Sequence, residues 1–210
     1  MKKGLLWLVL VGLLSLPLMA QDSRSELFGG FQFGHFGSVH TYDSYQNGGQ
    51  QGDQNNISAT INGVGWNGAY TFHINKSLGV AADFSGSYGS PAVMSGDGQG
   101  NLLPIKYRLQ AYTIAVGPVY YFPSQGKLTP FVHVLVGGNT MFGKPCAPSE
   151  TCGPSLNSSG GIAMFFGGGV DMKFKKKLAI RVGQFDWFHS AGEYGGNGNV
   201  RLSAGVVYHF

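Results

Sequence analysis

Apolar and polar side chains alternate along the last segment of the chain, residues 199–210. One face carries the apolar residues Val200, Leu202, Ala204, Val206, Tyr208 and Phe210. The other face carries Arg201, Ser203, Gly205, Val207 and His209. A period of two is the pattern of a β-strand, and about 9–11 tilted residues are enough for a strand to cross a bilayer. The segment therefore predicts a membrane-crossing strand with lipid on its apolar face and water on the other.

Together with this segment, the chain is predicted to form eight strands that alternate with long and short connections. The strands cover residues 26–36, 61–73, 78–88, 105–122, 128–140, 161–174, 178–188 and 199–210. The connections run long, short, long, short, long, short, long, and single-chain outer-membrane barrels combine long external loops with short periplasmic turns. Such a barrel must close, because an open edge leaves backbone groups unpaired in hydrocarbon. We therefore predict an all-β fold, an eight-stranded antiparallel up-and-down transmembrane β-barrel with its interior filled by side chains.

Two of the predicted strands, residues 105–122 and 128–140, depart from a simple alternation. Pro118 lies inside the strand at residues 105–122, and proline cannot donate a ladder hydrogen bond. We expect a bulge or an open hydrogen bond at this position. The pattern of residues 128–140 leaves open which of its two faces meets lipid.

Aromatic residues gather near the predicted strand ends, as they do in the two interfacial girdles of a membrane barrel. The predicted periplasmic girdle contains Phe72, Tyr120, Phe122, Phe174, Tyr208 and Phe210. The predicted external girdle contains Tyr88, Trp187 and Phe188.

The N-terminus has the three parts of a secretory signal peptide. Lys2 and Lys3 precede an apolar run at residues 4–18, and the small residue Ala20 follows it. The run is shorter than the roughly 20 apolar residues of a spanning helix. We predict that residues 1–20 are a signal peptide, with an uncleaved anchor as the alternative. Residues 21–210 suit a single barrel domain.

Composition agrees with a chain that faces two different solvents. Charged residues make up 11% of the chain, aromatic residues make up 13%, and there are 35 glycines. Soluble domains contain about a quarter charged residues. The formal net charge is +4. Lys2 and Lys3 of the predicted signal peptide contribute two of these positive charges, so residues 21–210 have a net charge of +2. That charge is too weak to indicate nucleic-acid binding.

The chain has two cysteines, Cys146 and Cys152, in a predicted external loop. Exported proteins meet an oxidising compartment, so we predict a small loop disulfide, with two free thiols as the alternative. The spacing fits neither a redox motif with two intervening residues nor a zinc site.

Four charged residues fall on inward positions by strand parity: Asp83, Asp171, Arg181 and Arg201. A charge that faces lipid at mid-bilayer is costly, and a buried charge without a partner is costlier than a paired one. We predict a lumen ion network that blocks the barrel, with an ion-conducting path as the alternative.

The whole mature chain resembles the eight-stranded outer-membrane barrels of the OmpA transmembrane-domain and OmpX type. The resemblance rests on the strand pattern, on stretches such as LGVAADFSG (78–86) and RLSAGV (201–206), and on the aromatic C-terminus. It implies that Tyr208 and Phe210 belong to a C-terminal signal that the barrel-assembly machinery reads. It also implies a bacterial outer-membrane location, with lipids and lipopolysaccharide as partners. We expect no peptidoglycan-binding domain after the barrel, in contrast to full-length OmpA.

An enzyme is the least favoured interpretation. His189, Ser190 and Glu193 are similar to the His, Ser and acid set of barrel lipid A deacylases, which have one residue between His and Ser. Here the two are adjacent, and consecutive strand residues point to opposite faces, so a base and a nucleophile would not meet. The other histidines show no metal-ligand spacing. We expect no enzymatic activity, metal or cofactor.

We therefore expect a monomeric structural or surface-interaction protein whose long external loops contact surfaces or ligands. These loops are rich in Tyr, Asn, Gln, Ser and Gly, and Tyr42, Tyr45 and Tyr194 are candidate contacts. A small porin-like channel is the main alternative. A soluble secreted barrel of lipocalin type is the non-membrane alternative, and it would need an apolar, ligand-lined interior.

Overall fold

The computed structural model describes residues 25–42, 56–96, 102–146, 152–153, 159–191 and 199–210. Its strands are β1 (Ser25–Tyr42), β2 (Asn56–His73), β3 (Leu78–Gly89), β4 (Ala92–Gly96), β5 (Leu102–Tyr121), β6 (Leu128–Cys146), β7 (Ser159–Lys175), β8 (Leu178–Ala191) and β9 (Asn199–His209). No helix long and apolar enough to span a membrane occurs in this part of the chain. The predicted signal peptide, residues 1–20, lies outside the described residues.

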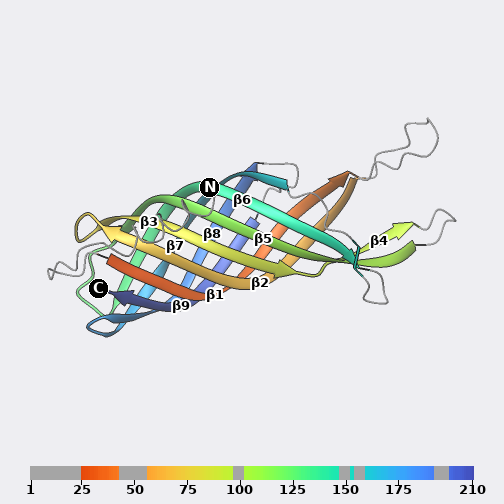
Figure 1. Cartoon of the computed structure of the whole chain (residues 1–210). Helices are drawn as coiled ribbons and strands as arrows, with labels where there is room; N and C mark the ends of the chain where they lie inside the picture. Colours follow the sequence, from red (N-terminus) through yellow and green to blue (C-terminus); the bar gives the residue numbers. More distant parts are fainter. Residues whose placement is uncertain (1–24, 43–55, 97–101, 147–151, 154–158, 192–198) are drawn as a thin grey trace, which may run out of the picture.

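The strands form one antiparallel sheet that closes on itself, as Figure 1 shows. β1 pairs with β2 and with β9, and the cylinder is completed because β3 pairs with β5. Short connections join β2 to β3, β5 to β6 and β7 to β8 at one end, which we call the turn end. We call the opposite end the loop end. The predicted eight-stranded barrel is confirmed, because β4 is a continuation of β3.

The register shows that β3 and β4 are two parts of one barrel strand. Tyr88 of β3 lies opposite Gln110, and Ala92 of β4 lies opposite Lys106, so the register on β5 is the same on both sides of the break. Ser90 and Pro91 separate the two parts. Proline has no N–H to donate, so it interrupts the ladder without ending the strand.

Several strands extend further at the loop end than the alternation predicts. β1 and β2 remain paired out to Tyr42 and Asn56, although the apolar pattern stops near residues 36 and 61. β6 likewise continues to Cys146. Backbone pairing does not require lipid, whereas the apolar alternation does. The periodicity therefore marks the hydrocarbon boundary and not the strand end.

The two faces of the barrel differ as the alternation predicts. Outward residues are apolar and exposed, with Phe31 as the extreme case at 84%. In β6, for which the sequence left the lipid-facing side open, Val132, Val134 and Val136 face outward. Its inward residues include Phe131, His133 and Leu135.

At Pro118 the ladder opens and no bulge forms. β5 and β6 pair at Val116 with Val136 and again at Val119 with His133, in an unchanged register. Gly117 and Pro118 make no ladder pair with β6 between these points. The missing proline N–H therefore costs hydrogen bonds locally and does not shift the strand.

A bulge does occur in β8, around Val182 and Gly183. Arg181 lies opposite Gly205 of β9, and the next described pair joins Gln184 to Ser203. Val182 and Gly183 are both exposed, so the inward side chains change from odd to even positions along β8. A bulge inserts one extra residue against the partner strand, which inverts the parity beyond it.

The bulge makes one predicted girdle position wrong. Phe188 is 4% exposed and points into the lumen, where its ring stacks on Phe165 at a centroid distance of 5.0 Å. Phe36 meets the Phe188 ring edge-on at 5.7 Å. Trp187 is the residue that faces outward. Without the bulge the parity of β8 would have placed Phe188 outside.

Close strand contacts at selected glycines predict a graded sensitivity to substitution. A Cβ added at Gly137 would overlap the backbone of Ile114 and Ala115, whereas a Cβ at Gly29 would meet nothing within 4 Å. We expect Gly137→Ala to lower the free energy of unfolding by about 1–3 kcal/mol, because the backbone must shift. Gly29→Ala, the matched control, should leave it unchanged. Unfolding of the refolded barrel in lipid, followed by heat-modifiable gel mobility, measures both, and equal midpoints would contradict the prediction.

Candidate functional site

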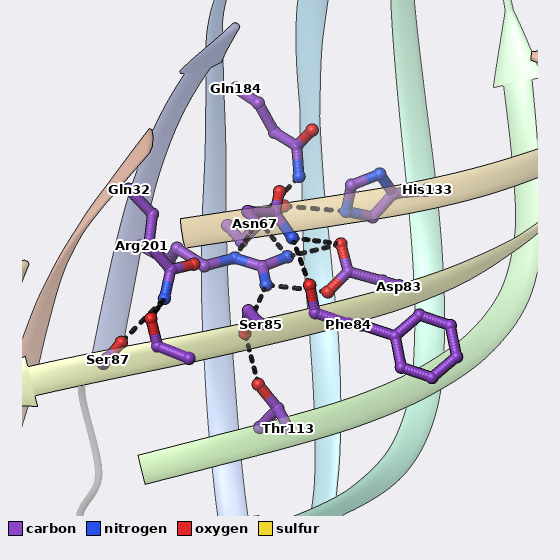
Figure 2. A network of polar contacts seen from close by, with 12 residues as sticks. Gln32, Asn67, Asp83, Phe84, Ser85, Ser87, Thr113, His133, Gln184 and Arg201 are labelled. Carbon is purple, nitrogen blue, oxygen red and sulfur yellow. Dashed lines mark hydrogen bonds and ion pairs between the residues drawn. The ribbon is translucent and has the colours of Figure 1, made fainter. Parts of the chain in front are cut away.

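Arg201 of β9 lies at the centre of a buried charge network that crosses the lumen (Figure 2). Its Nη1 donates to Asp83 Oδ1 at 2.8 Å, and its Nε donates to Asp186 Oδ2 at 2.7 Å. A further bond from Nη1 reaches the Ser85 hydroxyl at 3.2 Å. Arg201 is 3% exposed, and both carboxylates are equally inaccessible. One guanidinium thus links β9 to β3 and β8 through the barrel interior.

Asp186 collects hydrogen bonds from three other side chains. Besides Arg201, it lies 2.7 Å from His133 Nε2 and accepts a 2.8 Å bond from Gln184 Nε2. The Asp186 side chain has no solvent exposure. A carboxylate buried this completely is stable only when its oxygens are satisfied. Three neighbours fulfil that condition here.

A second arginine, Arg181 of β8, forms a bidentate pair with Asp171 of β7. The Nε and Nη2 atoms donate to the two carboxylate oxygens at 2.8 and 3.0 Å. The guanidinium carbon also lies 4.5 Å from the centroid of the Phe28 ring and 4.2 Å from that of Phe131. Bidentate geometry and aromatic faces are favourable surroundings for a buried guanidinium.

Gln184 connects the two arginine clusters. Its Oε1 accepts from Arg181 Nη1 at 2.9 Å, while its Nε2 donates to Asp186. The amide accepts on one side and donates on the other, and the β8 bulge allows Arg181 and Gln184 to face the lumen together. The bulge is therefore the feature that joins the network.

At the turn end, Glu26 of β1 extends the network toward the barrel mouth. Its carboxylate lies 3.6 Å from Arg181 Nη2 and accepts a hydrogen bond from the Tyr121 hydroxyl. His73 and His209 approach the other oxygen at 3.1 and 3.6 Å. Toward the loop end, polar contacts continue through Gln32 with Ser87, Asn67 with Asp83, and Ser85 with Thr113 (Figure 2).

Among the described residues, those that point into the lumen include more carboxylates than arginines. Glu26, Asp83, Asp171 and Asp186 are buried against Arg181 and Arg201. The excess negative charge meets donors from other groups, namely the Tyr121 hydroxyl, the Gln184 amide and imidazoles such as His133. This arrangement holds the buried charges in place through ion pairs and hydrogen bonds. Among the described residues, no cluster of metal-ligating side chains occurs.

The spaces beside the two lumen arginines are small. Two cavities of about 20 and 10 Å³ lie beside Arg201 and Arg181. A cavity needs about 10–15 Å³ to hold one water molecule, so these are sites for single waters. A larger pocket of about 370 Å³ opens at the turn-end mouth and is lined by residues that include Glu26, His73, Lys173 and His209.

Of the predicted site residues, the structure pairs Asp83 with Arg201 and Asp171 with Arg181. Sequence reasoning missed Asp186, Glu26, His133 and Gln184. Glu26 shares its parity with the inward Phe28, so that signal was available. His133 lay on the strand whose faces were undecided. Asp186 and Gln184 were hidden by the bulge, for which Gly183 was the only local hint.

The two cysteines and most of the predicted girdle aromatics lie where the sequence places them. Cys146 and Cys152 are joined by a disulfide at the loop end. Tyr208 and Phe210 lie on the outer surface near the turn end, with stacked rings 6.0 Å apart. The remaining outward aromatic residues of the predicted girdles are Phe72, Tyr88, Tyr120, Phe122, Phe174 and Trp187.

Comparison with known proteins identifies the class of this barrel. Residues 7–210 match the family described as outer membrane protein beta-barrel domain. The chain belongs to this family and is a protein of the bacterial outer membrane. Its turn end therefore faces the periplasm and its loop end faces the exterior. A comparison with curated proteins finds no match.

Solved outer-membrane barrels share the fold at low sequence identity. Neisserial surface protein A (NspA) has a TM-score of 0.60 and 13% identity, covering 90% of this chain and 99% of its own. OprG from Pseudomonas aeruginosa has a TM-score of 0.53 and 14% identity, covering 90% and 97%. Ail, the attachment invasion locus protein of Yersinia pestis, has a TM-score of 0.52 and 16% identity, covering 90% and 100%.

The network predicts that removing one central charge will destabilise the barrel strongly. Arg201→Gln leaves Asp83 and Asp186 without their shared cation. We expect a loss of about 3–5 kcal/mol in the free energy of unfolding, because breaking a buried ion pair leaves uncompensated charge. Lys127→Gln, at an exposed turn, is the control and should change little. Urea titration of the refolded proteins in lipid vesicles tests this, and equal stabilities would show that the pairs contribute nothing.

Proposed function

We propose that this protein is a non-enzymatic surface barrel that acts through its external loops while its lumen stays closed. The buried network of Arg201, Asp83 and Asp186 carries the proposal, because it occupies the cross-section where a channel would need water. Paired charges on three separate strands hold each other in place. A protein that is closed inside presents its function on its outer surfaces.

The composition of the loop end supports contact with surfaces or ligands. The external segments between β1 and β2 and between β8 and β9 contain Tyr45 and Tyr194, among many Asn, Gln, Ser and Gly residues. Tyrosine combines a large contact area with few rotatable bonds, and small polar residues adapt their hydrogen bonds to a partner. Tyr42 ends β1 at the same side of the barrel.

Two barrels with the same fold carry names that describe a surface role. NspA is named as a surface protein, and Ail is named for attachment and invasion. The shared fold makes the same use of loops available to this chain. On this view the barrel is a monomeric scaffold that holds its loops above lipid and lipopolysaccharide.

The geometry at the end of β8 supports the absence of catalysis. His189 is exposed on the outside, whereas Ser190 is 5% exposed and points inward. A base on one side of the wall cannot deprotonate a hydroxyl on the other. Glu193, the acid of the deacylase-like set with His189 and Ser190, lies outside the described residues.

The closed lumen predicts that the purified barrel will not conduct ions steadily. Planar-bilayer recordings of the wild type should show no large single-channel current. The double variant Arg181→Ser and Arg201→Ser should raise the conductance, provided that gel mobility shows a folded barrel. A large, steady current from the wild-type monomer would instead establish the small porin-like channel.

Surface contact predicts that adhesion depends on the loop tips. Replacing residues 43–55 and 192–198 by short Gly-Ser linkers should reduce adhesion of bacteria that display the barrel to the level of cells lacking it. Attachment to polystyrene and to a mixed extracellular-matrix coating measures this effect. The control replaces the periplasmic turn at residues 175–177 by Gly-Ser. Undiminished adhesion of folded, loop-shortened barrels to both surfaces would refute the proposal.

A further inference from the structure

The periplasmic end of the barrel carries cationic side chains around its whole rim. Lys76, Lys127 and the lysines at residues 175–177 belong to the three short turns, which lie together at one end (Figure 1). The described acidic side chains at this end are those of Glu26 and Asp171, and both are buried in the lumen. The exposed part of the described rim is therefore positive and attracts anions from the periplasm.

A pocket of about 370 Å³ lies inside this rim, and we call it the mouth pocket. Register shows that its lining side chains are on the lumen side of the wall. Lys173 lies opposite the buried Ala179, and Thr129 lies opposite the buried Asp171. Directly opposed residues of an antiparallel pair share one face of the sheet. The mouth pocket therefore opens from the lumen toward the periplasm, on the side of the wall away from lipid.

The hydrogen-bond acceptors on the floor of the mouth pocket already have donors. Both carboxylate oxygens of Asp171 accept from Arg181. Glu26 Oε1 accepts from the Tyr121 hydroxyl, and Glu26 Oε2 lies 3.1 Å from His73 Nε2. These two carboxylates are satisfied within the protein and do not require a cation from the periplasm.

Several donors that line the same pocket have no acceptor within the described part of the chain. Asn75 Oδ1 accepts from two backbone N–H groups of its own turn, while the Asn75 amide nitrogen makes no hydrogen bond to the described residues. Thr129 Oγ1 is buried and has no partner among them. Lys76 and Lys173 form no ion pair with a described acid. A pocket with unused donors suits a group that only accepts, such as an ionised carboxylate.

Two histidines at the edge of the mouth pocket can add further donors. His73 Nε2 and His209 Nδ1 lie 3.1 and 3.6 Å from the same carboxylate oxygen of Glu26. The second nitrogen of each ring makes no hydrogen bond to the described residues. A protonated imidazole donates through both nitrogens, and an anion nearby favours that form. Each ring can therefore connect Glu26 to an incoming carboxylate.

We propose that the mouth pocket binds the C-terminal end of an acidic peptide segment in the periplasm. The terminal carboxylate accepts from Lys76, Lys173 and the unused donors, and the outer lysines of the rim add long-range attraction. The volume is at the lower end of the range for ligand pockets, so it admits the end of a chain and not a folded domain. Ile74 and Ala179 line the pocket beside the polar groups and suit the carbon skeleton of a peptide. This site is at the opposite end of the barrel from the external loops and does not depend on their function.

The test titrates the complete folded barrel, in zwitterionic detergent micelles, into a tetrapeptide of glutamate residues that has a free C-terminus and a fluorescent N-terminal label. The pocket variant is Lys76→Gln with Lys173→Gln. Its matched control, Lys127→Gln with Lys177→Gln, removes the same charge from the same rim outside the pocket. Fluorescence anisotropy measures binding, and heat-modifiable gel mobility verifies folding. We expect the pocket variant to bind roughly 10-fold more weakly at low salt, and the control to bind within about two-fold of the wild type.

A second variant, Thr129→Val, separates a ligand contact from a structural role. Valine has nearly the same shape and lacks the hydroxyl, which has no partner among the described residues. We expect the peptide to bind roughly five-fold more weakly, while the urea midpoint of unfolding stays the same or rises, because removing an unpaired hydroxyl costs no hydrogen bond. Unchanged binding by this variant would contradict the placement of the carboxylate in the pocket.

Three further outcomes would overturn the proposal. The first is equal binding by the pocket variant and the wild type, and the second is an equal loss in the control, which would show that only net charge matters. The third is a C-terminally amidated peptide that binds as tightly as the free acid. Inorganic phosphate and phosphatidylglycerol in the micelles serve as competitors. Weak competition by both supports a peptide site, whereas complete displacement at low millimolar phosphate, or by the lipid, would refute it.

Discussion

Hydrocarbon has no hydrogen-bonding partner for a backbone group, and the rest of this structure depends on that constraint. The chain meets it by closing the sheet, with β1 against β9 and β3 against β5. Closure creates a narrow interior, in which the buried charged side chains are hydrogen-bonded within the protein, while a few polar atoms such as Gln32 Oε1 and Ser203 Oγ have no protein partner among the described residues. The breaks at Pro118 and at Ser90 and Pro91 are tolerated because the register continues beyond them.

Closure also explains where the charges lie. A carboxylate on the lipid face would be unsolvated, so the described acids occupy the lumen, where Arg181 and Arg201 neutralise part of their charge. Among the described residues, the charged side chains outside the lumen are cations that lie above and below the apolar belt. Inside, charge links strands that are distant in sequence, as Arg201 does with Asp83. The separation of charge across the barrel wall thus follows from where a charge can be solvated or paired.

The bulge in β8 shows how a local irregularity can determine a site. In a regular strand Arg181 and Asp186 would point to opposite faces, and Phe188 would lie in lipid. The extra residue at Val182 and Gly183 turns Gln184, Asp186 and Phe188 inward. The network gains its link between the two arginines, and the lumen gains an aromatic cluster. The bulge therefore changes which β8 residues face the lumen, and the alternation of side chains along the sequence does not reveal this change.

The sequence by itself determined the class of fold, the sides of most strands and four of the six buried acidic and arginine residues of the described chain. This was possible because the lipid boundary imposes a period of two on apolar residues and excludes charge. The tertiary structure decided which charges meet, how far the strands run beyond the membrane, and which residues a bulge inverts. Pairing of Arg201 with Asp83 depends on strands that closure brings together across the lumen. Contacts of that kind arise from the geometry of the cylinder, and no local pattern along the chain specifies them.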